Sequence, residues 1–134
     1  MKVGDNSEFT RTFTAQDLRD YAQLSGHKSA IKSERVPGPL IDVLISYALG
    51  EQQPGHGVVY LEQETHYQSG AVIDKPLTAK AEITQLRPDE KLAEFATTCR
   101  SADGTVVARG RALVHFGDLA HEDCNLADQK PAGI

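Results

Sequence analysis

The chain has 134 residues, the length of a single domain, and 40% of them are apolar and 25% charged, as in an ordinary globular protein. Its formal charge of −5 argues against nucleic acid or an anionic membrane surface as a partner, because both bind basic surfaces. No apolar run approaches the ~20 residues that span a bilayer. No apolar stretch follows the positive charge of Lys2, as it would in a signal peptide.

The two cysteines, Cys99 and Cys124, are too few for a disulfide framework and lack the spacing of a metal site. The five histidines also lack metal-ligand spacing. We therefore expect a cytoplasmic protein with reduced thiols, no metal and no cofactor.

The first third of the chain predicts a strand, a helix and a loop. Residues 9–14 have strand character, and Thr14 with Asp17 three residues later forms the capping pattern of a helix start. Gly26 ends this helix, since glycine readily adopts the left-handed conformation of a C-cap. Residues 27–37 are polar and aperiodic, which favours a loop.

The most apolar segment, residues 40–49, predicts a central helix. The Pro-Gly-Pro sequence of residues 37–39 suits its first turn, where a missing N–H costs nothing. Leucine, isoleucine and alanine form one broad stripe, and Val43 and Tyr47 fill much of the opposite side. A helix that is apolar nearly all round is buried, and Gly50 would end it.

The remaining pattern is that of strands, with period-2 character in four long segments: 58–67, 77–87, 92–100 and 105–116. Asp103-Gly104 joins the last two as a hairpin turn. On the last strand, Arg109 and Arg111 share a polar face, which either faces solvent or contacts a phosphate. The pattern predicts an α+β fold, a largely antiparallel sheet of about five strands around one helix. We expect this domain to span residues 1–117 and a flexible tail to span residues 118–134.

Four motifs follow one another in a characteristic order: residues 3–5 with 9–14, Leu-Ser-Gly at 24–26, residues 36–50, and Pro-Gly-x-Gly-x-x-Tyr-Leu-x-Gln at 54–63. Over about residues 3 to 116 the chain resembles the (R)-specific enoyl-CoA hydratases of the MaoC-like family. The resemblance implies a hotdog fold, a dimer with shared sites, and an acyl thioester of CoA or acyl carrier protein as ligand.

The resemblance also implies where the chemistry of such a protein would be. Family members carry Asp-x-Asn-Pro-x-His after Leu-Ser-Gly, and its Asp and His move the protons that hydration requires. Here the loop reads His-Lys-Ser-Ala-Ile-Lys, with His27 in place of the Asp and Lys32 in place of the His. A glycine at the start of the central helix polarises the thioester carbonyl through its N–H, and Gly38 keeps that position. Between Lys32 and Gly38 the chain is about a dozen residues shorter than the family pattern.

Several residues remain as candidates for a function, each beside a structural alternative. Asp42 lies in the first turn of the central helix; it is either a catalytic carboxylate or an acid stabilised by the helix dipole or facing a subunit partner. His27 and Lys32 are catalytic candidates by position, although an exposed loop also explains His27. Gly38, Ser46 and Tyr47 are candidates for binding substrate, and Gly38 also gives backbone freedom between two prolines.

These observations favour an acyl-thioester-binding protein that lacks hydratase activity. It would pair with itself or with another hotdog protein, for example as the non-catalytic subunit of a heteromeric dehydratase. Two alternatives stay open. One is a hotdog enzyme with altered chemistry, such as a thioesterase, isomerase or cyclase in fatty-acid or polyketide metabolism; the other is a structural or regulatory module that binds no thioester.

Overall fold

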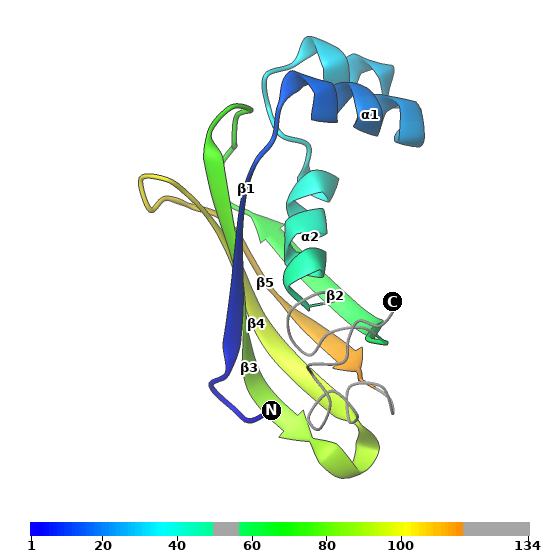
Figure 1. The fold of residues 1–134 in the computed structure, drawn as a ribbon, viewed down its shortest axis with the longest axis vertical. Helices are drawn as coiled ribbons and strands as arrows, with labels where there is room; N and C mark the ends of the chain where they lie inside the picture. Colours follow the sequence, from blue (N-terminus) through cyan, green and yellow to red (C-terminus); the bar gives the residue numbers. More distant parts are fainter. Residues whose placement is uncertain (50–56, 117–134) are drawn as a thin grey trace, which may run out of the picture.

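A computed structural model describes residues 1–49 and 57–116, and the predicted tail of residues 118–134 lies outside this part of the chain. The described residues form one antiparallel sheet with two helices (Figure 1). The five strands are β1 (Asn6–Thr12), β2 (Val59–Tyr67), β3 (Pro76–Arg87), β4 (Leu92–Ser101) and β5 (Val106–His115), in the order β1-β3-β4-β5-β2. The predicted α+β fold with a largely antiparallel sheet is confirmed.

The first helix begins and ends where the sequence predicts. In α1 (Ala15–Ser25) the Thr14 side chain accepts from the Asp17 N–H, and the Asp17 carboxylate accepts from the Thr14 N–H, which forms a capping box. Gly26 ends α1 with a φ of 82°. Part of the predicted loop is a short 3₁₀-helix, η1 (Lys28–Lys32), which packs against α1 beyond the sheet (Figure 1).

The central helix, α2 (Gly38–Tyr47), packs across the concave face of the sheet (Figure 1). Its buried side is Ile41, Leu44 and Ile45. Many of the sheet residues beneath it are small, and each has at most 1% of its surface exposed: Ala79, Ala81, Ala93, Ala108 and Ala112. Because these side chains end at Cβ, the helix axis can approach the strands closely.

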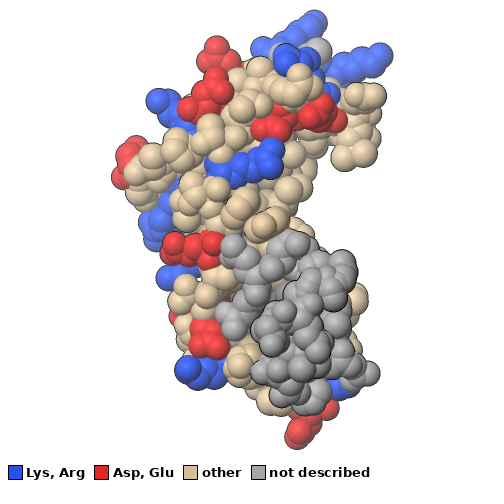
Figure 2. Space-filling view, in the orientation of Figure 1, with Lys and Arg blue, Asp and Glu red and all other residues tan. Residues whose placement is uncertain are grey.

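The prediction that α2 is buried nearly all round is wrong on one side. Val43 and Tyr47 are 53% and 41% exposed, because a single sheet covers only the near side of the helix. No helix of residues 1–49 and 57–116 is long and apolar enough to cross a membrane. On the face that Figure 2 shows, basic and acidic side chains are interspersed over the described residues.

Gly110 of β5 allows β5 to pair closely with the edge strand β2. It pairs with Thr65 on one side and Thr97 on the other. A Cβ at this position would clash with the backbone carbonyl group of Glu64 and lie 3.0 Å from the Thr65 Cα. Backbone atoms of a paired strand cannot give way as a flexible side chain can, so only glycine fits here.

We expect Gly110→Ala to lower the free energy of unfolding by roughly 1–3 kcal/mol, the usual cost of overpacking, although Gly→Ala in a strand is otherwise stabilising. Chemical denaturation followed by circular dichroism measures the change. Arg109→Ala, an exposed neighbour on the same strand, is the control and should change stability by less than about 0.5 kcal/mol. A Gly110→Ala protein as stable as the wild type would contradict the close packing of β2 on β5.

Candidate functional site

The side of α2 that faces β2 carries a hydrogen-bonded carboxylate. Thr65 Oγ1 donates to Asp42 Oδ1 over 2.8 Å, and the Tyr67 hydroxyl donates to Asp42 Oδ2 over 2.6 Å. Gln63 Nε2 lies 3.5 Å from Asp42 Oδ1. The three partners alternate along β2 and therefore share its helix-facing side. We call these four residues the Asp42 cluster.

Gly38 makes room for this arrangement at the start of α2. A Cβ on Gly38 would lie 2.9 Å from Tyr67 Cζ and 3.1 Å from the Tyr67 hydroxyl oxygen. The Tyr67 ring therefore crosses directly over Gly38 to reach Asp42, four residues further along the helix. A structural role for Gly38 thus stands beside the carbonyl-binding role that the family resemblance implies.

Two tyrosines beside Asp42 keep their protons. Burial, together with the hydrogen bond to Asp42 and its negative charge, raises the pKa of Tyr67 well above the ordinary 10.0. Burial also raises the pKa of Tyr60; the Ser46 side chain opposes this shift and the Asp42 charge adds to it. The Tyr60 hydroxyl is buried without a well-formed hydrogen bond in the described part of the chain, so its interaction with Ser46 is loose.

The structure separates the predicted site residues into two groups. Gly38, Asp42 and Ser46 lie on the side of α2 that faces β2. Tyr47 instead stacks on Phe9 of β1, with ring centroids 4.1 Å apart.

The two residues in the acid and base positions lie elsewhere. His27 is exposed at the end of α1, with its Nδ1 3.4 Å from the Tyr21 hydroxyl. Lys32 is exposed at the end of η1. Among the described residues, no hydrogen bond or ion pair joins either side chain to Asp42.

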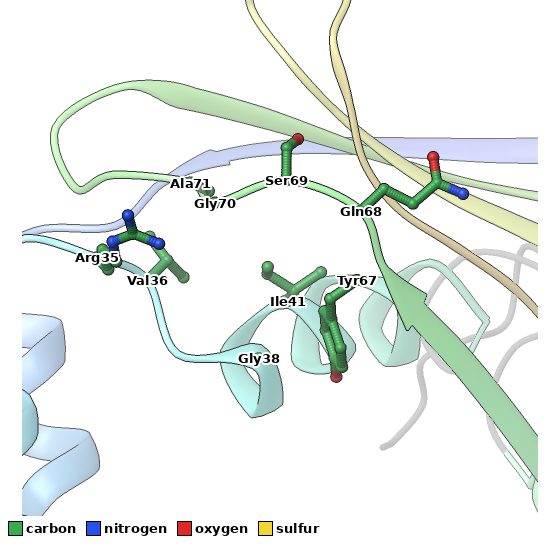
Figure 3. A pocket seen from close by; sticks show the side chains of 9 residues that line it. All are labelled: Arg35, Val36, Gly38, Ile41, Tyr67, Gln68, Ser69, Gly70 and Ala71. Carbon is green, nitrogen blue, oxygen red and sulfur yellow. The ribbon is translucent and has the colours of Figure 1, made fainter.

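A pocket of about 530 Å³ lies beside the start of α2 (Figure 3). It is lined by Arg35, Val36, Gly38 and Ile41 on one side and by residues 67–71 on the other. The Tyr67 ring thus forms one wall of the pocket, while the Tyr67 hydroxyl donates to Asp42. In residues 1–49 and 57–116, no group of three His, Cys, Asp or Glu side chains could hold a metal ion.

Thr65 and Tyr67 were missed by the sequence reasoning, although the sequence holds a signal for them. Gln63, Thr65 and Tyr67 form a polar row on a strand whose other face, with Glu64 and His66, is polar as well. A strand under a buried helix should present an apolar face, and this one does not. That departure indicates a polar partner on the helix, which is Asp42.

The pKa of Tyr67 should be lower in Asp42→Asn than in the wild type, because the negative charge of Asp42 disfavours the tyrosinate and the substitution removes that charge. Tyrosinate absorbance, read as the difference from the corresponding Tyr67→Phe proteins, measures this pKa. The neutral phenol contributes stability that is fully present below pH 10.0, the ordinary tyrosine pKa, and is lost as the pH rises through the higher folded-state value. Above pH 10.0, the Tyr67→Phe protein should therefore lose less stability than the wild type. An unchanged Tyr67 pKa in Asp42→Asn would contradict the hydrogen bond.

Known proteins resemble this chain over most of its length. It is 28% identical over 126 residues to the (R)-specific enoyl-CoA hydratase of Aeromonas caviae, covering 85% of this chain and 94% of that protein. It is 25% identical to the mitochondrial 3-hydroxyacyl-[acyl-carrier-protein] dehydratase of Arabidopsis thaliana, covering 89% and 80% of the two chains. No family model matches the chain.

Comparison with a solved structure gives the same result as comparison of the sequences. The (R)-hydratase of A. caviae involved in PHA biosynthesis superposes with a TM-score of 0.78 at 27% identity, over 87% of this chain and 97% of that one. The hotdog fold expected from the sequence is therefore confirmed. By fold and by sequence, the chain is similar to the (R)-specific enoyl-CoA hydratases and dehydratases of the MaoC-like hotdog family.

Proposed function

We propose that this protein binds an acyl thioester of CoA or acyl carrier protein without hydrating it, as the non-catalytic partner in a hotdog assembly. The observation that carries the proposal is the state of the acid and base positions. His27 and Lys32 replace the family's Asp and His, and both are exposed. They lie just after α1 and at the end of η1, not on the helix and strand that hold Asp42. Hydration requires an acid and a base directed at one double bond.

The surface of the described part supports a second hotdog chain as the partner. Val43 and Tyr47 leave an apolar flank exposed on α2, and Val59 and Leu61 on β2 are 56% and 52% exposed. β2 is an edge strand of the sheet, and unpaired edges with apolar side chains are sites of association. In such an assembly, located in the cytoplasm, this chain would contribute Gly38 and part of the acyl groove.

The purified protein alone should hydrate crotonyl-CoA at no more than the background rate, because each missing acid or base group costs about 10²–10⁴-fold in rate. Loss of the enoyl absorbance measures the reaction, with an intact (R)-specific enoyl-CoA hydratase assayed in parallel. Turnover at the rate of that enzyme, unaffected by His27→Ala or Asp42→Ala, would show that hydration here needs none of these groups.

A second candidate function, thioester hydrolysis or isomerisation, is favoured by the Asp42 cluster. A partly exposed carboxylate lies one helical turn from Gly38, beside a pocket, and could accept a proton from a water or from the carbon next to a carbonyl. Against this, Gln63, Thr65 and Tyr67 already direct donors at its two oxygens. A carboxylate with satisfied oxygens is also what a structural role requires.

Asp42→Asn separates the two functions. We expect it to leave thioester affinity unchanged and to alter the melting temperature by only a few degrees, since asparagine keeps one acceptor and its amide can pair with the Tyr67 oxygen. Calorimetric titration with butyryl-CoA and thiol release from a panel of acyl-CoAs give the two readouts. Asp89→Asn, an exposed acid in the turn between β3 and β4, is the matched control. Thioester turnover that is lost in Asp42→Asn and kept in Asp89→Asn would establish the second function instead.

A further inference from the structure

Arg35 brings a positive charge to the pocket beside α2 (Figure 3). It is the charged residue of the lining, and its guanidinium has no carboxylate partner among the described residues. Other arginines are neutralised: Arg11 pairs with Asp17, and Arg111 pairs with both Glu62 and Glu94. The Arg35 charge is therefore available to a ligand.

The protein holds this guanidinium in a defined place. A Cβ on Gly70 would lie 2.9 Å from Arg35 Nη1, so the guanidinium rests on the backbone of a residue that lacks a side chain. Val36 N–H donates to the Ala71 carbonyl and Ile73 N–H to the Glu34 carbonyl, which ties the two segments around Arg35 and Gly70 together. The opposite wall is also fixed, because Ser69 Oγ donates to the Val106 carbonyl.

The rest of the lining suits an organic ligand with one charged end. Val36, Ile41 and the Tyr67 ring are apolar surfaces, whereas the Gly38 N–H at the start of α2 has no acceptor within the helix. The positive end of the α2 dipole adds to the Arg35 charge in the same space. A volume of about 530 Å³ is in the range of small-molecule sites.

We propose that Arg35 binds an oxyanion of the thioester ligand in this pocket, through a charge-assisted hydrogen bond of the kind that a guanidinium makes with carboxylate or phosphate. The inference rests on the proposed function and adds a ligand preference to it: the protein selects anionic thioesters. Two sources supply the same chemistry, a carboxylate on the acyl chain or a phosphate of CoA.

Four compounds distinguish these sources by calorimetric titration: succinyl-CoA, butyryl-CoA, and the succinyl and butyryl thioesters of N-acetylcysteamine, which contain no phosphate. Arg35→Gln should weaken binding of the anionic ligand about tenfold or more, and should leave the butyryl N-acetylcysteamine thioester unaffected. Gly70→Ala keeps the charge but displaces the guanidinium, and it should weaken the same ligands. Weakening confined to the two succinyl compounds identifies the acyl carboxylate; equal weakening of the two CoA compounds identifies a phosphate.

Arg87→Gln is the matched control, because this arginine is exposed and is the last residue of β3. The end of β3 lies far from the start of α2 (Figure 1). Wild-type affinity of Arg35→Gln for all four compounds would overturn the inference while leaving thioester binding intact. If the wild type binds none of the four, the proposed function fails and this inference fails with it. Circular dichroism melting of Arg35→Gln verifies that the variant is folded.

Discussion

The close approach of α2 to the sheet is the constraint on which the rest of this molecule depends. Alanines on β3, β4 and β5 allow a close approach of α2 to the strands, and Ile41, Leu44 and Ile45 fill the space between helix and sheet. That contact places the start of α2 against the end of β2, so that a carboxylate on the helix and a phenol on the strand meet. The polar site is thus a product of the apolar packing beneath it.

The start of α2 combines a glycine that the family resemblance implies with a neighbour that the resemblance does not imply. The glycine at the helix start is retained, but its neighbour in space is a tyrosine ring that reaches over it. The function proposed above keeps the groove for the ligand without the acid and the base, since the groove depends on the fold and the proton transfers depend on two side chains. In the inference drawn above, the Arg35 guanidinium held against Gly70 would then favour anionic ligands.

Most of the fold could be predicted from the sequence because its signals are local. The capping box of Thr14 and Asp17 and the left-handed Gly26 depend on neighbours within four residues, and the structure has both. The strand segments were placed to within about two residues at most ends, since period-2 alternation marks them. The exposed flank of α2 was not predictable, because the apolar pattern of a helix does not determine how much of its surface the sheet covers.

The site was only partly predictable, because its members are distant in sequence. Asp42 could be named from its place on the apolar helix, and Gly38 from the family resemblance. Thr65 and Tyr67 become their partners only once β2 pairs with β5 and is carried beneath α2. The Arg35 pocket also depends on the isolated β-bridge between Arg35 and Val72. No local sequence pattern in either segment predicts this bridge.

The Asp42 cluster has a consequence for how β2 finds its alignment in the sheet. Most strands are aligned by an apolar face that must point inward, but β2 is polar on both faces over much of its length. A slip of one residue would turn Glu62, Glu64 and His66 toward the helix and bring carboxylates against Asp42. Like charges in that space repel, whereas Gln63, Thr65 and Tyr67 supply donors. The charge of one carboxylate on α2 thus disfavours a slipped alignment of an edge strand, a task that hydrophobicity performs elsewhere in the same sheet.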